Sequence, residues 1–180
     1  MTTNEAKVAA CESIINYEFQ DPILCLQALQ ASGHAIWWHH GFVRVYKNDR
    51  LAVFGDAVAK AAVCRRWFDS GRNKGQWTQV EQALLGNSNL SAVGRRHGLQ
   101  DCVILNQGTV SVSDKTMATT VEAILGAVLI DGGNEALGAV LITLGLTHPL
   151  LQAVTFYLPV LLYKQDCTPL SALTEFLDRT

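Results

Sequence analysis

NDRLAVFGDAV, residues 48–58, is the stretch of this sequence that decides its fold. Its apolar residues continue at near-helical spacing to about Ser70, which predicts a long helix capped by Asn48. Gly55 stands inside that helix, where an unforced glycine costs about 1 kcal/mol relative to alanine. We therefore expect the backbone of another segment to approach Gly55 closely.

The rest of the chain also reads as helices joined by short loops. Lys115 to Ile130 places its apolar residues on one face and is closed by Asp131-Gly132-Gly133, and a final helix begins at Asn134. Four further helices are expected over residues 4–15, 22–29, 76–85 and 88–97, the last capped by Ser88 and stopped by Gly98. The aromatic run AIWWHHGFVRVYK, residues 35–47, suits an ordered loop or a short hairpin. The fold class is all-α, in a single domain over residues 1–180.

The composition narrows the class of protein. Hydrophobic residues make up 49% of the chain and charged residues 17%, which favours a surface for self-association. The net charge of -2 and the lack of any dense Lys/Arg stretch argue against tight autonomous nucleic-acid binding. Five scattered cysteines and an amino terminus unlike a signal peptide predict an intracellular, cytoplasmic protein with free thiols.

One apolar segment, residues 136–163, is long enough to span a bilayer. Pro149 and Pro159 interrupt it, so we favour two buried helices joined at residues 147–149 and expect no membrane partner. Thr168-Pro169 leads a last short helix, so C-terminal helices are expected over residues 147–180.

Four blocks of the sequence resemble the ribonuclease III domain family. NDRLAVFGDAV resembles the family signature NERLEFLGDSV, and TTVEAILGAVLIDGG (119–133) resembles the second acidic motif DxFEALIGAxYLDGG. YEFQDPILCLQAL (17–29) and KGQWTQVEQALLGNSNLSAVGRRHGL (74–99) resemble two further blocks in the same order. The resemblance covers about residues 11–146 and is greatest to fungal single-domain members. It implies an all-α ribonuclease III-like endonuclease-domain fold and a symmetric homodimer through the 48–58 helix, with Val53 where the family places an aromatic residue, and Phe54 beside it.

The family resemblance also implies an acidic site, because a cluster of carboxylates holds the Mg²⁺ ions that hydrolyse phosphodiesters. Six positions carry those acids in the family, and they fall here on Asp49, Ala52, Asp56, Lys74, Thr119 and Glu122. Three acids are therefore replaced, one of them by a cation. We expect Mg²⁺ binding at Asp56 and Glu122 to be weak or lost and no cofactor to be required.

Several interpretations of these residues stay open. Asp56 and Glu122 are either structural, for example paired with Lys74, or part of a pocket for another ligand, or remnants of nuclease chemistry. Residues 37–40, Trp-Trp-His-His, are either an aromatic plug beside the first helices or a pocket wall where His39 or His40 handles protons. A zinc site there lacks a further spaced ligand. The basic pairs 65–66 and 95–96 are more typical of solvated faces than of RNA contacts.

Three functions follow. The first is a non-cleaving RNA-binding or scaffold protein; no segment resembles the double-stranded-RNA-binding domain common in the family, so double-stranded RNA would lie in the dimer groove. The second is a non-nuclease enzyme whose former metal cleft binds a small molecule, with Asp56, Glu122 and His39 or His40 as acid and base; the aromatic run and low charge favour it. The third is a weak double-stranded RNA endonuclease. The first is our main prediction, and the sequence alone does not separate it from the second.

Overall fold

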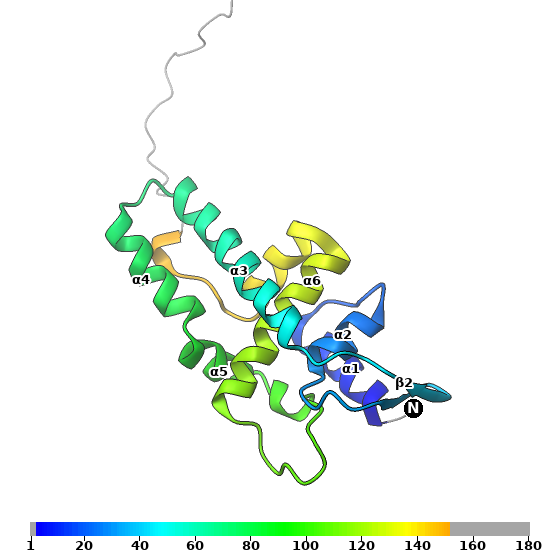
Figure 1. The fold of residues 1–180 in the computed structure, drawn as a ribbon. Helices are drawn as coiled ribbons and strands as arrows, with labels where there is room; N and C mark the ends of the chain where they lie inside the picture. The colour runs from blue at the N-terminus through cyan, green and yellow to red at the C-terminus, as the bar shows by residue number, and fades with distance from the viewer. Residues whose placement is uncertain (1–2, 152–180) are drawn as a thin grey trace, which may run out of the picture.

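The computed structural model describes residues 3–151, which fold into a helical domain with one small hairpin (Figure 1). In chain order the elements are α1 (Thr3–Ile15), α2 (Pro22–Leu29), β1 (Ile36–Trp38), β2 (Gly41–Val43), α3 (Asp49–Asp69), α4 (Lys74–Leu85), α5 (Asn87–Arg96), the 3₁₀ turn η1 (Leu99–Asp101), α6 (Asp114–Thr143) and the 3₁₀ turn η2 (Pro149–Leu151). The all-α fold is confirmed. The helices predicted from residue 152 onward, including the one led by Thr168, lie outside the described residues.

Helix α6 is the centre of the domain, because α2, α3 and α5 all pack against it (Figure 1). Among residues 3–151 it is the only helix long and apolar enough to cross a membrane on length and composition. Most of its apolar side chains from Met117 to Leu141 lie in the core of the domain, whereas Ile130 is exposed. Burial against three helices therefore accounts for the hydropathy of α6.

Helices α3 and α6 cross with their backbones in direct contact. A Cβ atom built on Gly55 would lie 1.7 Å from the Glu122 carbonyl oxygen, and one built on Gly126 would lie 2.7 Å from the Leu51 carbonyl oxygen. No side chain fits in either place, since real Cβ atoms do not approach backbone oxygens this closely. The expected close approach at Gly55 is confirmed, and its partner is α6.

Asn48 does not cap α3 as predicted. Its side chain makes no capping hydrogen bond. Instead the buried amide donates to the Ala28 carbonyl oxygen at 3.0 Å and lies 3.5 Å from Thr120 Oγ1, while the Asn48 backbone N–H donates to the Gln30 carbonyl oxygen at 2.9 Å. Asn48 thus joins the start of α3 to α2 and α6. Its side chain makes these contacts with other helices instead of capping its own helix.

Other helix ends show smaller differences from prediction. Helix α4 begins at Lys74, earlier than expected, because Asn73 and Gln76 form a reciprocal capping box. Helix α5 begins after Gly86 with no side-chain cap, so the predicted Ser88 cap is wrong. Gly133 has φ 72° and ψ -166°, which breaks α6 where the sequence predicted one helix to end and another to start.

The aromatic run forms the predicted short hairpin. Strands β1 and β2 are antiparallel, with Ile36 opposite Val43 and Trp37 opposite Phe42, and β1 packs against α1. Trp38 is 8% exposed and faces inward, whereas Trp37 is 43% exposed and meets the ring of Phe42 edge-on at 5.0 Å. Only half of the expected aromatic plug is therefore buried.

A carboxylate at the end of the first segment of α6 holds the loop between α1 and α2. Asp131 accepts hydrogen bonds from the Tyr17 hydroxyl at 2.6 Å and from the backbone N–H groups of Gln20 and Asp21, each at 2.9 Å. Burial raises the pKa of Asp131, but these hydrogen bonds outweigh it and leave the pKa below its ordinary value. Burial and the bond to Asp131 raise the pKa of Tyr17 to about 12.

The cysteines that the structure describes, Cys11, Cys25, Cys64 and Cys102, are free thiols, and Cys167 lies outside the described residues.

Candidate functional site: the α3–α6 crossing

Asp56 and Glu122 face each other across the α3–α6 crossing. Asp56 is exposed on α3, one residue after the buried Gly55, and Glu122 is half-buried on α6. Burial, and secondarily repulsion from Asp56, raises the pKa of Glu122 to about 7. Neither carboxylate accepts a hydrogen bond or joins an ion pair within residues 3–151. The pair is thus available to a ligand from outside the chain.

The other two signature positions on α3, Asp49 and Ala52, differ from this pair in exposure and in ligand atoms. Asp49 is exposed in the first turn of α3, and its carboxylate accepts a hydrogen bond from the Arg50 N–H at 2.8 Å. Ala52 is buried, and its methyl group offers no ligand atom.

Lys74 does not pair with either carboxylate. It is exposed at the start of α4 and takes part in no ion pair that the structure shows. The cation near Asp56 is instead Lys60, which forms an ion pair with Glu81 of α4 and lines a hollow of about 400 Å³ with Asp56. Sequence reasoning missed Lys60, although its spacing four residues after Asp56 places both on one helical face.

Thr119 opens onto a different hollow, of about 320 Å³. Two lysines, Lys47 and Lys115, line this hollow with Thr119, Leu105 and Asn106. No aspartate or glutamate is among the described residues that line it. The family's acid position therefore opens here onto a hollow whose charged lining residues are two lysines.

The structure does not bring His39 or His40 to the acidic pair, which corrects the expectation of a shared acid–base pocket. Both lie in the turn between β1 and β2. His39 Nδ1 is 3.3 Å from a Glu5 carboxylate oxygen on α1, and its backbone N–H donates to the same oxygen at 2.9 Å. The hairpin packs against α1 rather than over the α3–α6 crossing, because its inner residues complete the core there.

Metal-ligand clustering is absent from the part of the chain that the structure describes. No group of three or more His, Cys, Asp or Glu side chains within residues 3–151 could hold an ion.

Two of the basic side chains weighed as RNA contacts are neutralised: Arg65 pairs with Asp69 at 2.9 Å, and Arg95 with Asp114 at 2.8 Å. Their geometry fits a solvated face.

Comparison with known proteins identifies the class to which this fold and these motifs belong. Residues 49–133 match the family model of the ribonuclease III domain. The chain therefore belongs to the ribonuclease III domain family.

Individual relatives and structures agree with this assignment. The chain is 30% identical over 135 residues to a ribonuclease 3 of Rhodopirellula baltica, covering 72% of this chain and 48% of the relative, and 29% identical over 140 residues to that of Caldanaerobacter subterraneus, covering 74% and 60%. It thus spans about half the length of the curated relatives it matches. The nuclease domain of ribonuclease III from Campylobacter jejuni has the same fold, with a TM-score of 0.63 at 24% identity over 76% of this chain and 95% of that one. The greater likeness to fungal members stays a prediction.

Proposed function

We propose that this chain is a non-cleaving ribonuclease III-like protein that forms a homodimer and serves as an RNA-binding scaffold. One observation carries the proposal: the residues at the family's metal-binding positions do not fit Mg²⁺. The weak or lost metal site, the dimer and the double-stranded RNA partner are all parts of this proposal.

Mg²⁺ requires several oxygen ligands in near-octahedral geometry, and phosphodiester cleavage in addition requires them to be anionic enough to offset phosphate charge. Asp56 and Glu122 supply two carboxylates at the crossing. Ala52 is a buried methyl group, Lys74 is a cation, and Thr119 shares its hollow with two lysines. Three positions that would complete the cage therefore contribute no negative charge.

The support for a dimer comes from the exposed face of α3. Val53 is 75% exposed and Phe68 is 71% exposed, and Phe54 is also exposed on this helix. Exposed apolar side chains of this size near both ends of one helix favour a protein partner. The Campylobacter jejuni nuclease domain has been described in terms of flexibility in the region involved in its dimer formation. We infer that a second copy of this chain covers α3.

A duplex RNA of about thirty base pairs, in millimolar Mg²⁺ or Mn²⁺, tests the loss of cleavage. The wild-type chain should leave the duplex intact, and Asp56→Asn should behave identically. Cutting that disappears in Asp56→Asn but persists in the control Asp69→Asn would overturn the proposal and favour a weak double-stranded RNA endonuclease. That outcome would agree with the name of the relatives, ribonuclease 3.

Restoring the family's three missing acids gives a second test, which measures Mg²⁺ binding rather than RNA cleavage. The triple variant Ala52→Glu, Lys74→Glu, Thr119→Asp changes the formal charge of the site by about four units, and calorimetry should show tighter Mg²⁺ binding than in the wild type. Unchanged affinity would contradict the assignment of these positions to the site.

Light scattering tests the dimer. The wild-type chain should have about twice its mass of 19.6 kDa. Val53→Asp should be monomeric, whereas Val110→Asp, at a loop valine that is 98% exposed, should remain dimeric. A monomeric wild type would contradict the scaffold dimer directly.

A further inference from the structure

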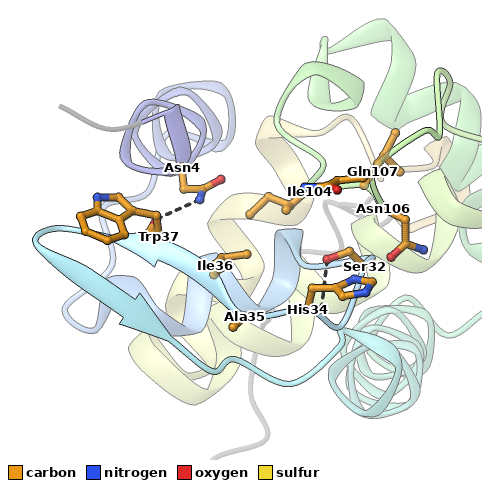
Figure 2. Close-up of a pocket in the computed structure, with 10 residues that line it drawn as sticks. Asn4, Ser32, His34, Ala35, Ile36, Trp37, Ile104, Asn106 and Gln107 are labelled. Atoms are coloured by element: carbon orange, nitrogen blue, oxygen red, sulfur yellow. Dashed lines mark hydrogen bonds between the residues drawn. The ribbon is translucent and has the colours of Figure 1, made fainter.

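A sizeable hollow lies outside the family's acidic site. It has a volume of about 670 Å³, within the roughly 300–1,000 Å³ typical of small-ligand sites. Figure 2 shows Asn4 and Trp37 at one end and Ser32, His34 and Asn106 at the other, with Ile36 and Ile104 between them. It is built by α1, by β1 with the loop before it, and by the loop after η1.

Hydrogen bonds fix the two loops that form its walls. The buried Gln30 side chain donates to the His34 carbonyl oxygen at 2.7 Å and accepts from the Ser32 hydroxyl at 2.7 Å. The Ala31 N–H donates to the Ile104 carbonyl oxygen at 3.0 Å, which joins one loop to the other. The hollow is therefore formed before any ligand arrives, which lowers the entropic cost of binding.

Several polar side chains in this hollow have unused hydrogen-bonding capacity. The amides of Asn106 and Gln107 and the imidazole of His34 make no side-chain hydrogen bond to any described residue. Asn4 uses its amide N–H₂ on the Trp37 carbonyl oxygen at 2.9 Å, and its own amide oxygen accepts no hydrogen bond from residues 3–151. Amides and imidazoles both donate and accept, so they match the mixed edge of a heterocycle.

The lysine-lined hollow adjoins this one, because Leu105 and Asn106 line both. Lys47 and Lys115 lie on its walls, and neither is in an ion pair within the described part of the chain. Gly33, in the first loop, would carry a Cβ atom 3.7 Å from Lys47 Cβ, so Lys47 lies against the loop that supplies Ser32 and His34 to the larger hollow. The two adjoining hollows thus form one trough, with neutral hydrogen-bonding side chains in the larger hollow and two lysines in the smaller one.

From this arrangement we propose that the trough binds an unpaired nucleotide of an RNA strand, with the base in the larger hollow and its phosphate between Lys47 and Lys115. The amide-rich hollow recognises the base edge between apolar walls, and the two ammonium groups and the Thr119 hydroxyl bind the phosphate. RNA as the nucleic acid rests on the proposed function; the nucleotide itself rests on the trough.

Threonine in place of the family's acidic residue at position 119 suits the binding of a phosphate at this site. A carboxylate at the family's acid position would face the phosphate from the wall of the lysine-lined hollow and repel it. Threonine removes that charge and leaves a hydroxyl that donates to a phosphate oxygen. The change that weakens the metal site therefore favours the nucleotide site.

Fluorescence anisotropy with labelled eight-nucleotide RNAs of each base tests the proposal on the full chain. At least one single strand should bind more tightly than an eight-base-pair duplex. The double variant Asn106→Ala, Gln107→Ala should weaken that binding about tenfold. The double variant Lys47→Gln, Lys115→Gln should also weaken it about tenfold, and should flatten the dependence of affinity on salt by about one unit of slope.

The matched control removes two cations elsewhere: Arg66→Gln, Arg72→Gln lies outside both hollows and should bind as the wild type does. Thr119→Asp should weaken binding, while Thr119→Ser should not. Equal affinity for strand and duplex, or double variants that are folded by circular dichroism and bind like the control, would overturn the proposal. A free nucleoside monophosphate that binds as tightly as the octamer would overturn the assignment to a strand.

These outcomes are independent of the tests of the proposed function. A dimer that leaves duplex RNA intact but binds no octamer refutes this site alone. A chain that cuts duplex RNA yet binds the octamer through Lys47 and Lys115 refutes the non-cleaving function alone.

Discussion

The α3–α6 crossing and the β1–β2 hairpin stabilise the domain in opposite ways. At the crossing, Gly55 and Gly126 bring two backbones into contact, and the fold depends on the absence of side chains. In the hairpin, Ile36 and Trp38 complete the core beneath β1, and the fold depends on their presence, while Trp37 and Phe42 remain exposed on the other face.

This difference shows which part of the domain is free to change chemistry. Substitutions at the crossing are limited to side chains beside the glycines, such as those at positions 52 and 56. The outer face of the hairpin and the loops beside it have no such limit, because their exposed side chains contribute little burial. Single substitutions in the two regions test this contrast.

Gly55→Ala should have the largest effect. The new methyl group would overlap the Glu122 carbonyl group, so the two helices must separate, and we expect the free energy of unfolding to fall by at least about 3 kcal/mol. Urea denaturation measures it. The control is Gly138→Ala, where a Cβ atom meets nothing within 4 Å; it should gain about 0.5–1 kcal/mol. Equal stability of the two variants would contradict the close crossing.

Trp38→Ala tests the inner face of the hairpin. Removing a large, 8% exposed side chain leaves a cavity beside α1, and the free energy of unfolding should fall by about 3 kcal/mol. Urea denaturation again gives the value. A loss below about 1 kcal/mol would show that the hairpin does not seal the core.

Asp131→Asn tests how far the stability of the domain depends on a polar side chain of α6 that binds the loop between α1 and α2. It removes the charge that accepts bonds from Tyr17, Gln20 and Asp21, at an expected cost of about 2 kcal/mol at neutral pH. Because folding lowers the pKa of Asp131, its stabilising contribution is present above the unfolded pKa of about 3.9 and is lost as the pH falls through the folded value.

Thermal unfolding of wild type and Asp131→Asn between pH 7 and pH 3 provides the measurement. The difference between their melting temperatures should shrink as the pH falls below about 4. A difference that is constant over this range would mean that the Asp131 charge does not stabilise the loop.

Trp37→Ala should have the smallest effect, below about 1 kcal/mol, since the side chain is 43% exposed and its ring contacts that of Phe42, which is 74% exposed. Comparing its denaturation midpoint with that of Trp38→Ala measures the two faces of one strand. A larger loss from Trp37→Ala than from Trp38→Ala would reverse the assignment of inner and outer faces.

Most of the fold could be predicted from sequence because its signals are local. Periodic apolar residues located the helices, and the cost of Gly55 required a close backbone contact, which the structure supplies at Glu122. Asn48 and Ser88 were assigned as caps on the same local logic and failed. The Asn48 amide is used by α2 and α6, whose proximity no short window of sequence reveals.

The site could be predicted less fully, because it depends on which loops meet. The resemblance selected Asp56 and Glu122, and the structure places them across one crossing. The adjacent tryptophans and histidines drew attention to residues 37–40, yet both histidines lie in the hairpin turn, where His39 contacts Glu5 of α1. Asn106, Gln107 and Lys115 carry no motif, and only the pairing of the Gln30 and Ile104 segments brings them beside His34 and Lys47.

The hydrogen bond from the Asn48 N–H to the Gln30 carbonyl oxygen also has an evolutionary consequence. This bond joins the two ends of the segment that contains the hairpin, residues 31–47, and so connects α2 directly to α3. Loop-closure entropy rises only slowly with loop length, so a segment whose ends are bonded in this way tolerates insertions and deletions. Relatives can therefore acquire or discard a surface element at this point while inheriting the same helical framework.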